Sequence, residues 1–110
     1  MQEPDHYAAV PQLARLRKDV LYQDVWKQPE LSSRDRCLVT CAILGALGKN
    51  AELEFHMGKA VENGVTPDEL RGLVVQLAFY AGWPCGVSSA KAGLAVFRAD
   101  QASKVDPGGR

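Results

Sequence analysis

A glutamate and a histidine stand four positions apart in the stretch "AELEFHMGKA", residues 51–60. Residues at this spacing share one face of an α-helix, so Glu52 could orient the imidazole of His56. A histidine titrates near neutral pH and can therefore transfer a proton in catalysis. A Glu–His pair at this spacing can also do no more than stabilise its helix by about a few tenths of a kcal/mol. The spacing alone leaves both interpretations open.

The Glu52–His56 pair lies beside the apolar stripe of its helix, not at the centre of the solvent face. Leu53 and Met57 begin that stripe, and Phe55 falls on the other flank of the pair. This position suits a pocket wall or a subunit contact. A metal site is not expected, because one His and one Glu supply only two ligands where zinc usually takes three or four from protein.

Two arginines, Arg34 and Arg36, fall in the first turn of an otherwise apolar predicted helix. Cations at that end oppose the helix dipole, so they are poor choices for helix stability alone. Because Arg binds carboxylates through two parallel hydrogen bonds, the pair could hold a small carboxylated substrate. The alternative is an ion pair to Asp35, to Glu52 or to a neighbouring subunit, and the sequence does not decide between them.

The remaining candidate groups are thiols and aromatic rings. Cys37 and Cys41 share one face of an apolar helix and are expected to pack in the core. Cys85 would be the second residue of a helix, where free N–H groups lower the pKa of a thiol, so it is either a reactive thiol or a packing residue. Tyr80 and Trp83, in "FYAGWP", meet at a helix junction and could fill the core, form an interface or line a pocket.

The positions of the apolar and turn-forming residues predict an all-α bundle of about five helices joined by short connections. The expected helices begin near Pro11, after the N-cap Ser32, near Ala51, after the N-cap Thr66 and at Pro84, and the first ends near Trp26. The first should turn Leu13, Leu16 and Val20 inward. The stretch 37–47 has Thr40 as its one polar side chain and is expected to be buried on every side. The last should continue past Leu94 to Phe97.

Composition limits the possible functions. The chain has 110 residues, 46% hydrophobic and 24% charged, with a formal net charge of zero. We expect one domain over residues 1–103 and a flexible tail over 104–110. Scattered Lys and Arg argue against nucleic-acid binding, and no apolar run approaches the roughly 20 residues that span a membrane. Three cysteines without a disulfide pattern, and no signal-peptide pattern, favour the cytoplasm. A core this small favours self-association.

Several of these motifs recur together in one family. The pieces are "SRDR" before an apolar helix, "EL" followed by His after two intervening residues, "NGVTPDE" and "YAGWP". Over residues 31–97 the chain resembles the carboxymuconolactone decarboxylase family, within the alkylhydroperoxidase-D-like (AhpD-like) superfamily. The resemblance implies an all-α fold that assembles as trimers or hexamers, with pockets near the subunit contacts.

The resemblance also separates two kinds of chemistry. Peroxidase-type members carry Cys-x-x-Cys-x-x-x-His; with that histidine placed on His56, Lys49 and Glu52 stand where the cysteines would be. The redox pair is missing. The decarboxylase branch instead has Glu and His here, with arginines in the preceding helix turn, and its substrate is 4-carboxymuconolactone, with no metal or organic cofactor. By this resemblance His56 supplies a proton, Glu52 orients it, and Arg36 or Arg34 holds a carboxylate or oxyanion.

Two other functions stay open from the sequence. One is an AhpD-like thiol peroxidase or oxidoreductase that uses Cys85. The other is a non-catalytic oligomer that has kept the fold and binds a small ligand. In the decarboxylase interpretation, Tyr80, Trp83 and Cys85 would join Arg34 in contacting the substrate.

Overall fold

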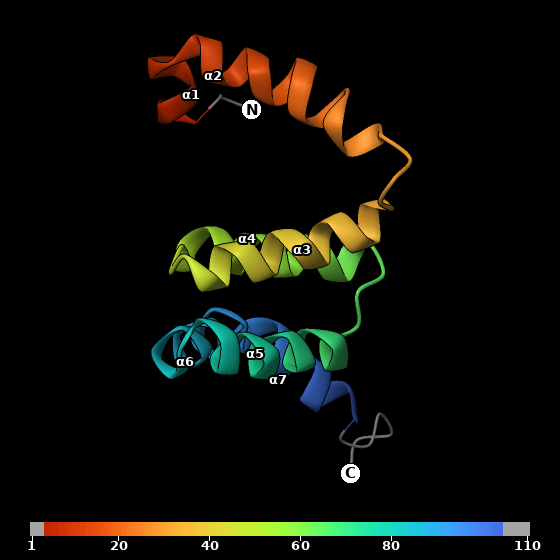
Figure 1. The fold of residues 1–110 in the computed structure, drawn as a ribbon, viewed down its shortest axis with the longest axis vertical. Coiled ribbons are helices and arrows are strands. Elements are labelled where there is room, and N and C mark those ends of the chain that lie inside the picture. The colour runs from red at the N-terminus through yellow and green to blue at the C-terminus, as the bar shows by residue number, and fades with distance from the viewer. Residues whose placement is uncertain (1–3, 105–110) are drawn as a thin grey trace. The chain divides into compact units, whose positions relative to one another are not determined.

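The computed structural model describes residues 4–104, and this part of the chain forms seven α-helices and no strand (Figure 1). The predicted all-α class is confirmed. The chain comprises two compact units, residues 1–33 and 34–110, which we describe separately. The predicted tail lies outside the described residues except for Lys104, the last residue of α7. No helix in the described range is long and apolar enough to cross a membrane.

The first unit is helical but irregular. It contains α1 (Asp5–Ala9), α2 (Pro11–Leu16), a π-helical segment (Arg17–Tyr22) and a 3₁₀ turn (Val25–Lys27). Helix α2 and the π-helical segment therefore occupy most of the predicted helix, which ends at Tyr22 and not near Trp26.

The prediction that one side of this first helix is buried is wrong for the unit taken by itself. Leu13, Leu16 and Val20 are 48%, 43% and 43% exposed. None of the described residues of this unit is buried; Tyr22 and Trp26 are half-buried, with ring centroids 5.7 Å apart. A helix can bury an apolar side only against another element, and this unit supplies too few of them.

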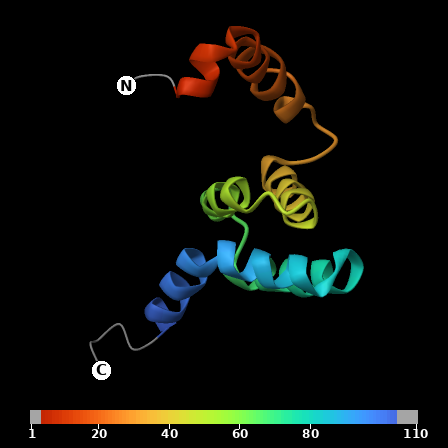
Figure 2. The same cartoon turned by 90° about the vertical axis from the view of Figure 1, so that its left-hand side faces the viewer.

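The second unit has two layers. Helices α3 (Ser33–Ala46) and α4 (Asn50–Glu62) form one layer, and the other contains α5 (Pro67–Ala81) and α6 (Trp83–Ala92), followed by α7 (Leu94–Lys104) (Figures 1 and 2). Between the layers lie the fully buried side chains of Cys37, Cys41, Leu53, Met57, Val65, Leu70 and Ser89. Helix α4 ends close to the prediction, and Gly64 follows it with a φ of +96°, a conformation that favours glycine.

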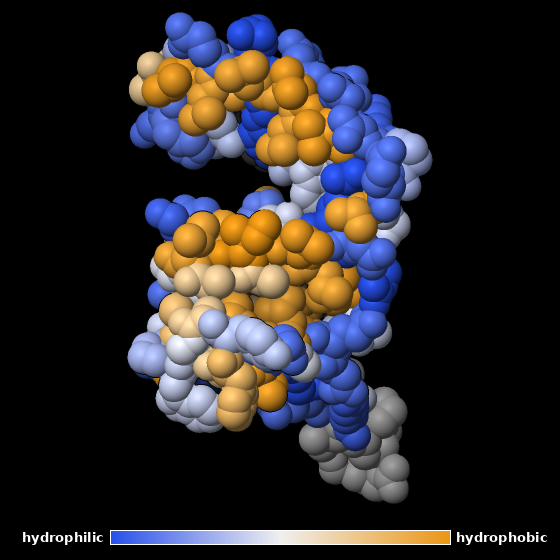
Figure 3. Space-filling model, viewed as in Figure 1, coloured by the Kyte–Doolittle hydropathy of each residue, from blue (hydrophilic) through white to orange (hydrophobic). Residues whose placement is uncertain are grey.

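Helix α3 is buried along one side only. Cys37, Cys41 and Gly45, at four-residue intervals, are buried. Val39, Ile43 and Leu47, on and just after the same helix, are 46%, 52% and 65% exposed. The expectation of burial on every side is therefore wrong for the single chain. Helices α4, α5 and α6 all contact α3 around Gly45. The other side of α3 stays exposed, and Figure 3 shows hydrophobic surface over α3 and the adjoining part of α5.

Helix α5 begins with the capping box that the sequence predicts. The Glu69 N–H donates to Thr66 Oγ1 at 3.0 Å, and the Thr66 N–H donates to Glu69 Oε1 at 2.9 Å. These two bonds satisfy N–H groups that the first helical turn would otherwise leave without acceptors. Pro67 occupies the first helical position, where its missing N–H costs nothing.

The last predicted helix is two helices, because the chain turns at Gly93. A Cβ at this position would lie 2.5 Å from the Phe97 ring and 2.9 Å from Met57 Sδ. Any side chain at this position would therefore force the Phe97 ring or the Met57 side chain to shift. The regular spacing of Leu94 and Phe97 after Ala90 concealed this turn in the sequence.

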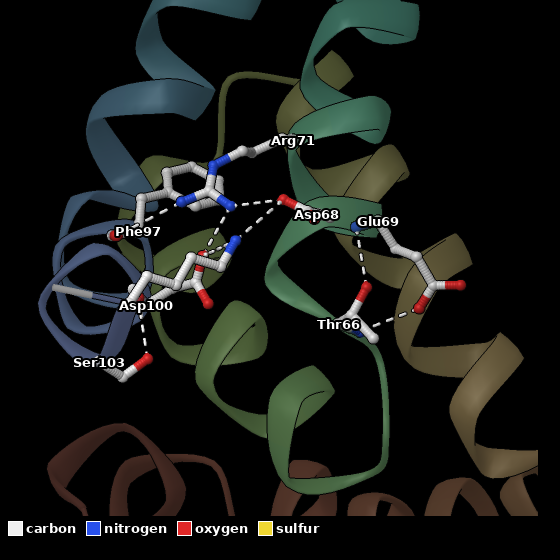
Figure 4. A network of polar contacts seen from close by, with 8 residues as sticks. Thr66, Asp68, Glu69, Arg71, Phe97, Asp100 and Ser103 are labelled. Atoms are coloured by element: carbon white, nitrogen blue, oxygen red, sulfur yellow. Dashed lines mark hydrogen bonds and ion pairs between the residues drawn. The ribbon is translucent and has the colours of Figure 1, made fainter. Parts of the chain in front are cut away.

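An ionic cluster joins the start of α5 to α7 (Figure 4). Arg71 Nη1 lies 2.7 Å from Asp68 Oδ1 and 2.8 Å from Asp100 Oδ2, and its guanidinium lies over the Phe97 ring at 5.1 Å. The Arg71 hydrogen bond holds the pKa of Asp100 below its usual value. This cluster therefore stabilises the fold above the usual titration range of Asp, and the contribution is lost as the pH falls through the lowered pKa.

The contact between α5 and α6 yields a test of the packing. A Cβ on Gly86 would overlap the Cβ of Ala78 and lie 3.0 Å from its Cα. Gly86→Ala should therefore lower the free energy of unfolding by about 1–3 kcal/mol, as overpacking usually does. Urea unfolding followed by far-UV circular dichroism measures this change.

Gly58→Ala is the matched control, since Gly58 lies within α4 and its added Cβ meets nothing within 4 Å. It should leave stability unchanged or raise it by up to about 1 kcal/mol. Equal effects of the two substitutions would contradict the close approach of α5 and α6.

Candidate functional site

The Glu–His pair lies on α4 beside the buried core. Glu52 is exposed and His56 is half-buried, while Leu53 and Met57 on the adjacent stripe are fully buried. The His56 ring stands edge-on to Phe55, with centroids 5.2 Å apart and an interplanar angle of 88°. The pair thus borders both the core and the surface, as its spacing indicates. Its catalytic role stays a prediction.

The two arginines start helix α3. Arg34 Nη1 lies 3.0 Å from Asp35 Oδ1, which is one of the ion pairs that the sequence left open. Its other arm, Nη2, pairs with Glu69 of α5, a partner that the sequence did not indicate. Arg36, two residues further along the same turn, is half-buried.

The Arg34–Glu69 pair changes the titration of both groups. The pKa of Glu69 is lowered, first by the hydrogen bond from the Thr66 backbone and then by that from Arg34. The pKa of Arg34 is raised, chiefly by its hydrogen bond to Glu69. Both groups therefore stay charged at neutral pH.

An apolar groove of about 640 Å³ runs between α3 and α5. From α3 it is lined by Leu38, Val39, Ala42 and Ala46. From α5 it is lined by Glu69, Gly72, Leu73, Gln76, Leu77, Tyr80 and Ala81. Its volume is in the range of small-molecule sites, which are mostly apolar with a few polar groups.

Polar groups stand near both ends of this groove. Among the described residues that line it, Glu69 alone is charged, and it brings Arg34 to the rim. Tyr80 lies eleven positions further along α5, roughly 16 Å at the rise of an α-helix, and is 84% exposed. The structure thus brings Arg34 and Tyr80 to one groove. Glu52 and His56, on α4, are not among its lining residues.

Trp83 belongs to a different cavity. It is the first residue of α6 and lines a space of about 200 Å³ between α5 and α6. Its ring stands edge-on to Phe79, with centroids 6.1 Å apart. Gly82 separates the two helices with a φ of +114°, which side-chain-bearing residues rarely adopt. The two predicted substrate-binding aromatics are therefore not brought together.

The three cysteines differ in their surroundings. Cys37 and Cys41 are buried, and burial raises the pKa of Cys41 to about 12, with a smaller contribution from Cys37. Burial also raises the pKa of Cys37. Cys85, the third residue of α6, is half-buried, and its thiol donates to the carbonyl oxygen of Ala46 at 3.6 Å. Since Ala46 lines the α3–α5 groove, Cys85 lies just behind the groove wall.

Sequence reasoning identified Glu69 only as a helix-capping residue. Its contact with Arg34 spans 35 positions, so no local pattern reveals it. Acidic and basic groups at the starts of two helices were visible in the sequence, but their pairing depends on how α3 and α5 pack. Within residues 4–104, no group of three or more His, Cys, Asp or Glu side chains is placed to hold a metal ion.

Comparison with known proteins adds to this geometry. Residues 11–98 match the model of the carboxymuconolactone decarboxylase family. The chain is 40% identical over 75 residues to 4-carboxymuconolactone decarboxylase of Acinetobacter baylyi, covering 68% of this chain and 56% of that protein. It is 39% identical over 62 residues to nitrosuccinic acid decarboxylase npaB of Metarhizium robertsii, covering 54% of this chain and 42% of that protein.

The chain therefore spans about half the length of the curated relatives that it matches. The family match nevertheless extends from α2 to α7 and includes "ELEFH", "NGVTPDE" and "YAGWP". The chain belongs to the carboxymuconolactone decarboxylase family.

Proposed function

We propose that this protein is a cofactor-free decarboxylase that acts on a small carboxylated lactone or a related intermediate of aromatic-compound degradation. The observation that carries the proposal is the family match over residues 11–98. The two relatives support it further, since both are named as decarboxylases and both share about two fifths of the aligned residues.

The reaction needs two things from the protein. When the substrate carboxylate leaves as CO₂, the electron pair of the broken C–C bond moves into the conjugated lactone carbonyl and forms an extended enolate. A proton must then reach carbon, so one proton is consumed for each CO₂ released. The protein must stabilise the oxyanion and deliver that proton.

The proposed roles follow from the chemistry of the side chains and from the resemblance to the decarboxylase family. His56 delivers the proton, and Glu52, one helical turn earlier on α4, orients the imidazole and favours its protonated form. Half-burial of His56 suits this role, because the group must face substrate and yet regain a proton from water. Arg36 stabilises the oxyanion and Arg34 binds a carboxylate.

Tyr80, Trp83 and Cys85 are proposed as substrate contacts of different kinds. Tyr80 lines the same groove that Arg34 borders through Glu69. Cys85 supports the groove wall through Ala46. Trp83 lies in the neighbouring cavity and would reach the substrate only from the α5–α6 junction.

We also infer that the protein self-associates as a trimer or hexamer. The support is the exposed apolar side of α3, where Val39, Ile43 and the following Leu47 are about half or more exposed. Single exposed apolar residues are ordinary, but a contiguous row on a helix that is apolar all round is typical of an interface.

The Glu52–His56 pair can be tested by its pH dependence. His56→Ala should lower kcat by about 10²–10⁴-fold, the usual contribution of a positioned general acid. Glu52→Gln removes a negative charge beside the imidazolium, so the pH above which activity falls should move to a lower value. The double variant should be little worse than His56→Ala, because residues that act as a unit are not additive. The measurement is the pH–rate profile on 4-carboxymuconolactone.

Glu62→Gln is the control for this series, since it removes a charge from α4 at an exposed position that pairs only with Lys59 among the contacts described. Its profile should match that of the unmodified protein. Full activity in His56→Ala, with an unchanged circular dichroism spectrum, would reject a catalytic role for His56 and favour the interpretation that it only stabilises its helix.

Thiol labelling tests the alternative peroxidase chemistry. With the pKa of Cys41 near 12 and both α3 cysteines buried, iodoacetamide at pH 8 should modify no residue other than Cys85 in the folded protein. All three cysteines should react in urea. Mass spectrometry counts the modified residues. Rapid peroxide reduction driven by a dithiol, abolished by Cys85→Ser, would favour the peroxidase over the decarboxylase.

Self-association has a direct measurement. Light scattering coupled to size exclusion should give a mass about three or six times 12.0 kDa. Ile43→Lys places a charge on the exposed side of α3 and should shift the protein toward smaller species. A stable monomer of 12.0 kDa at micromolar concentration would reject the inference.

A further inference from the structure

Arg34 meets the protein's own carboxylates at the end of the α3–α5 groove. One arm of its guanidinium contacts Asp35 and the other contacts Glu69, and the Arg34 side chain is 36% exposed. A ligand carboxylate that binds both Nη atoms of Arg34 must therefore compete with these two partners. Glu69 is the partner that also lines the groove.

Glu69 is held in place by its own helix and does not depend on Arg34. Its Oε1 accepts the Thr66 N–H at 2.9 Å, while Oε2 contacts Arg34. The two oxygens thus have separate tasks. Arg34 can leave Oε2 without breaking the capping box, so its release does not disturb the start of α5.

We propose that Glu69 is an internal competitor for the carboxylate site of Arg34, so that its charge sets how tightly the groove holds a carboxylated ligand. The inference deepens the proposed function and rests on it, because Arg34 is there the carboxylate-binding residue. Glu69 becomes a specificity-determining residue: it stays beside the site after displacement, and its negative charge opposes additional negative charge on the ligand.

The residues that line the groove indicate the chemistry of the ligand beyond its carboxylate. Leu38, Ala42 and Leu73 provide apolar walls, and Gln76 is an uncharged polar group further along. The ligand class is therefore a small molecule with an apolar body and one carboxylate directed at Arg34.

The neighbouring carboxylate on α5 supplies a matched comparison. Figure 4 shows that Asp68 joins the cluster of Arg71 and Asp100, while Glu69 extends from α5 in another direction. Asp68 does not line the α3–α5 groove. Asp68→Asn therefore removes the same charge from the same helical turn without touching the Arg34 site.

The experiment measures binding by isothermal titration calorimetry at pH 7 and low salt, with cyclohexanecarboxylate as the ligand and cyclohexanecarboxamide as its neutral counterpart. Glu69→Gln retains an acceptor oxygen for the Thr66 N–H. It should bind the carboxylate roughly two- to fivefold more tightly, since partly exposed ion pairs are weak competitors. Arg34→Gln should bind it at least about fivefold more weakly. Asp68→Asn and the carboxamide should show no such change.

Arg34→Lys keeps the charge but loses the two-pronged geometry, so it should give an intermediate affinity and covers the case in which Arg34→Gln fails to fold. Unchanged or weaker carboxylate binding in Glu69→Gln would overturn the proposal. Equal tightening in Asp68→Asn would also overturn it, because the effect would then be general electrostatics.

These binding results separate the inference from the proposed function. Tighter carboxylate binding in Glu69→Gln, together with no decarboxylation of any lactone by the unmodified protein, would reject the enzyme activity and leave the competitor role standing. Decarboxylation with an affinity that is indifferent to Glu69 would reject the competitor role and leave the activity standing.

Discussion

The second unit depends on a close approach of four helices at Gly45. A Cβ on this residue of α3 would lie 2.6 Å from Leu77 Cδ1 of α5, 2.7 Å from Ser89 Oγ of α6 and 3.5 Å from Leu53 Cδ2 of α4. Any side chain at this position would therefore force Leu77 and Ser89 to shift, so glycine suits the point at which these three helices contact α3. This close packing also encloses the Ser89 hydroxyl, whose Oγ is buried without a hydrogen-bond partner among the described residues.

This contact also determines where surface is left open. Helices α4, α5 and α6 all meet the Cys37–Gly45 side of α3. The opposite side of α3 is therefore left exposed by the described residues 34–104. The α3–α5 groove and the exposed row beside it both follow from this one-sided burial. An apolar helix in a small domain thus has surface for a ligand and for a subunit contact.

Charge is concentrated where helices begin. The start of α5 carries Asp68 and Glu69, which suit the positive end of a helix dipole, and each pairs with an arginine from a different helix or turn. Glu69 contacts Arg34 of α3, whereas Asp68 contacts Arg71, which reaches Asp100 of α7. The first pair borders the groove and the second fastens α7. Asp68 and Glu69, although adjacent and both negatively charged, therefore stabilise different contacts. The proposed proton donor, His56, lies on another helix, α4.

Local patterns in the sequence determined the helix starts, the helix limits and the buried side of α4. The capping box of Thr66 and Glu69, the limits of α4 and the burial of Leu53 and Met57 depend on residues within a turn or two of one another. Such features are decided by backbone hydrogen bonding and helical period, which a single stretch of sequence contains. The placement of Glu52 and His56 on one helical face is of the same kind.

The tertiary structure decided what depends on contacts between distant residues. The lack of room for a side chain at Gly93 depends on Phe97 and on the distant Met57, and the pairing of Arg34 with Glu69 follows from the packing of α3 on α5. The separation of Tyr80 and Trp83 into two cavities follows from the left-handed conformation of Gly82. Periodicity shows that a helix has an apolar side, but only packing decides which neighbour covers that side, because burial is a property of helices in contact and not of one helix alone.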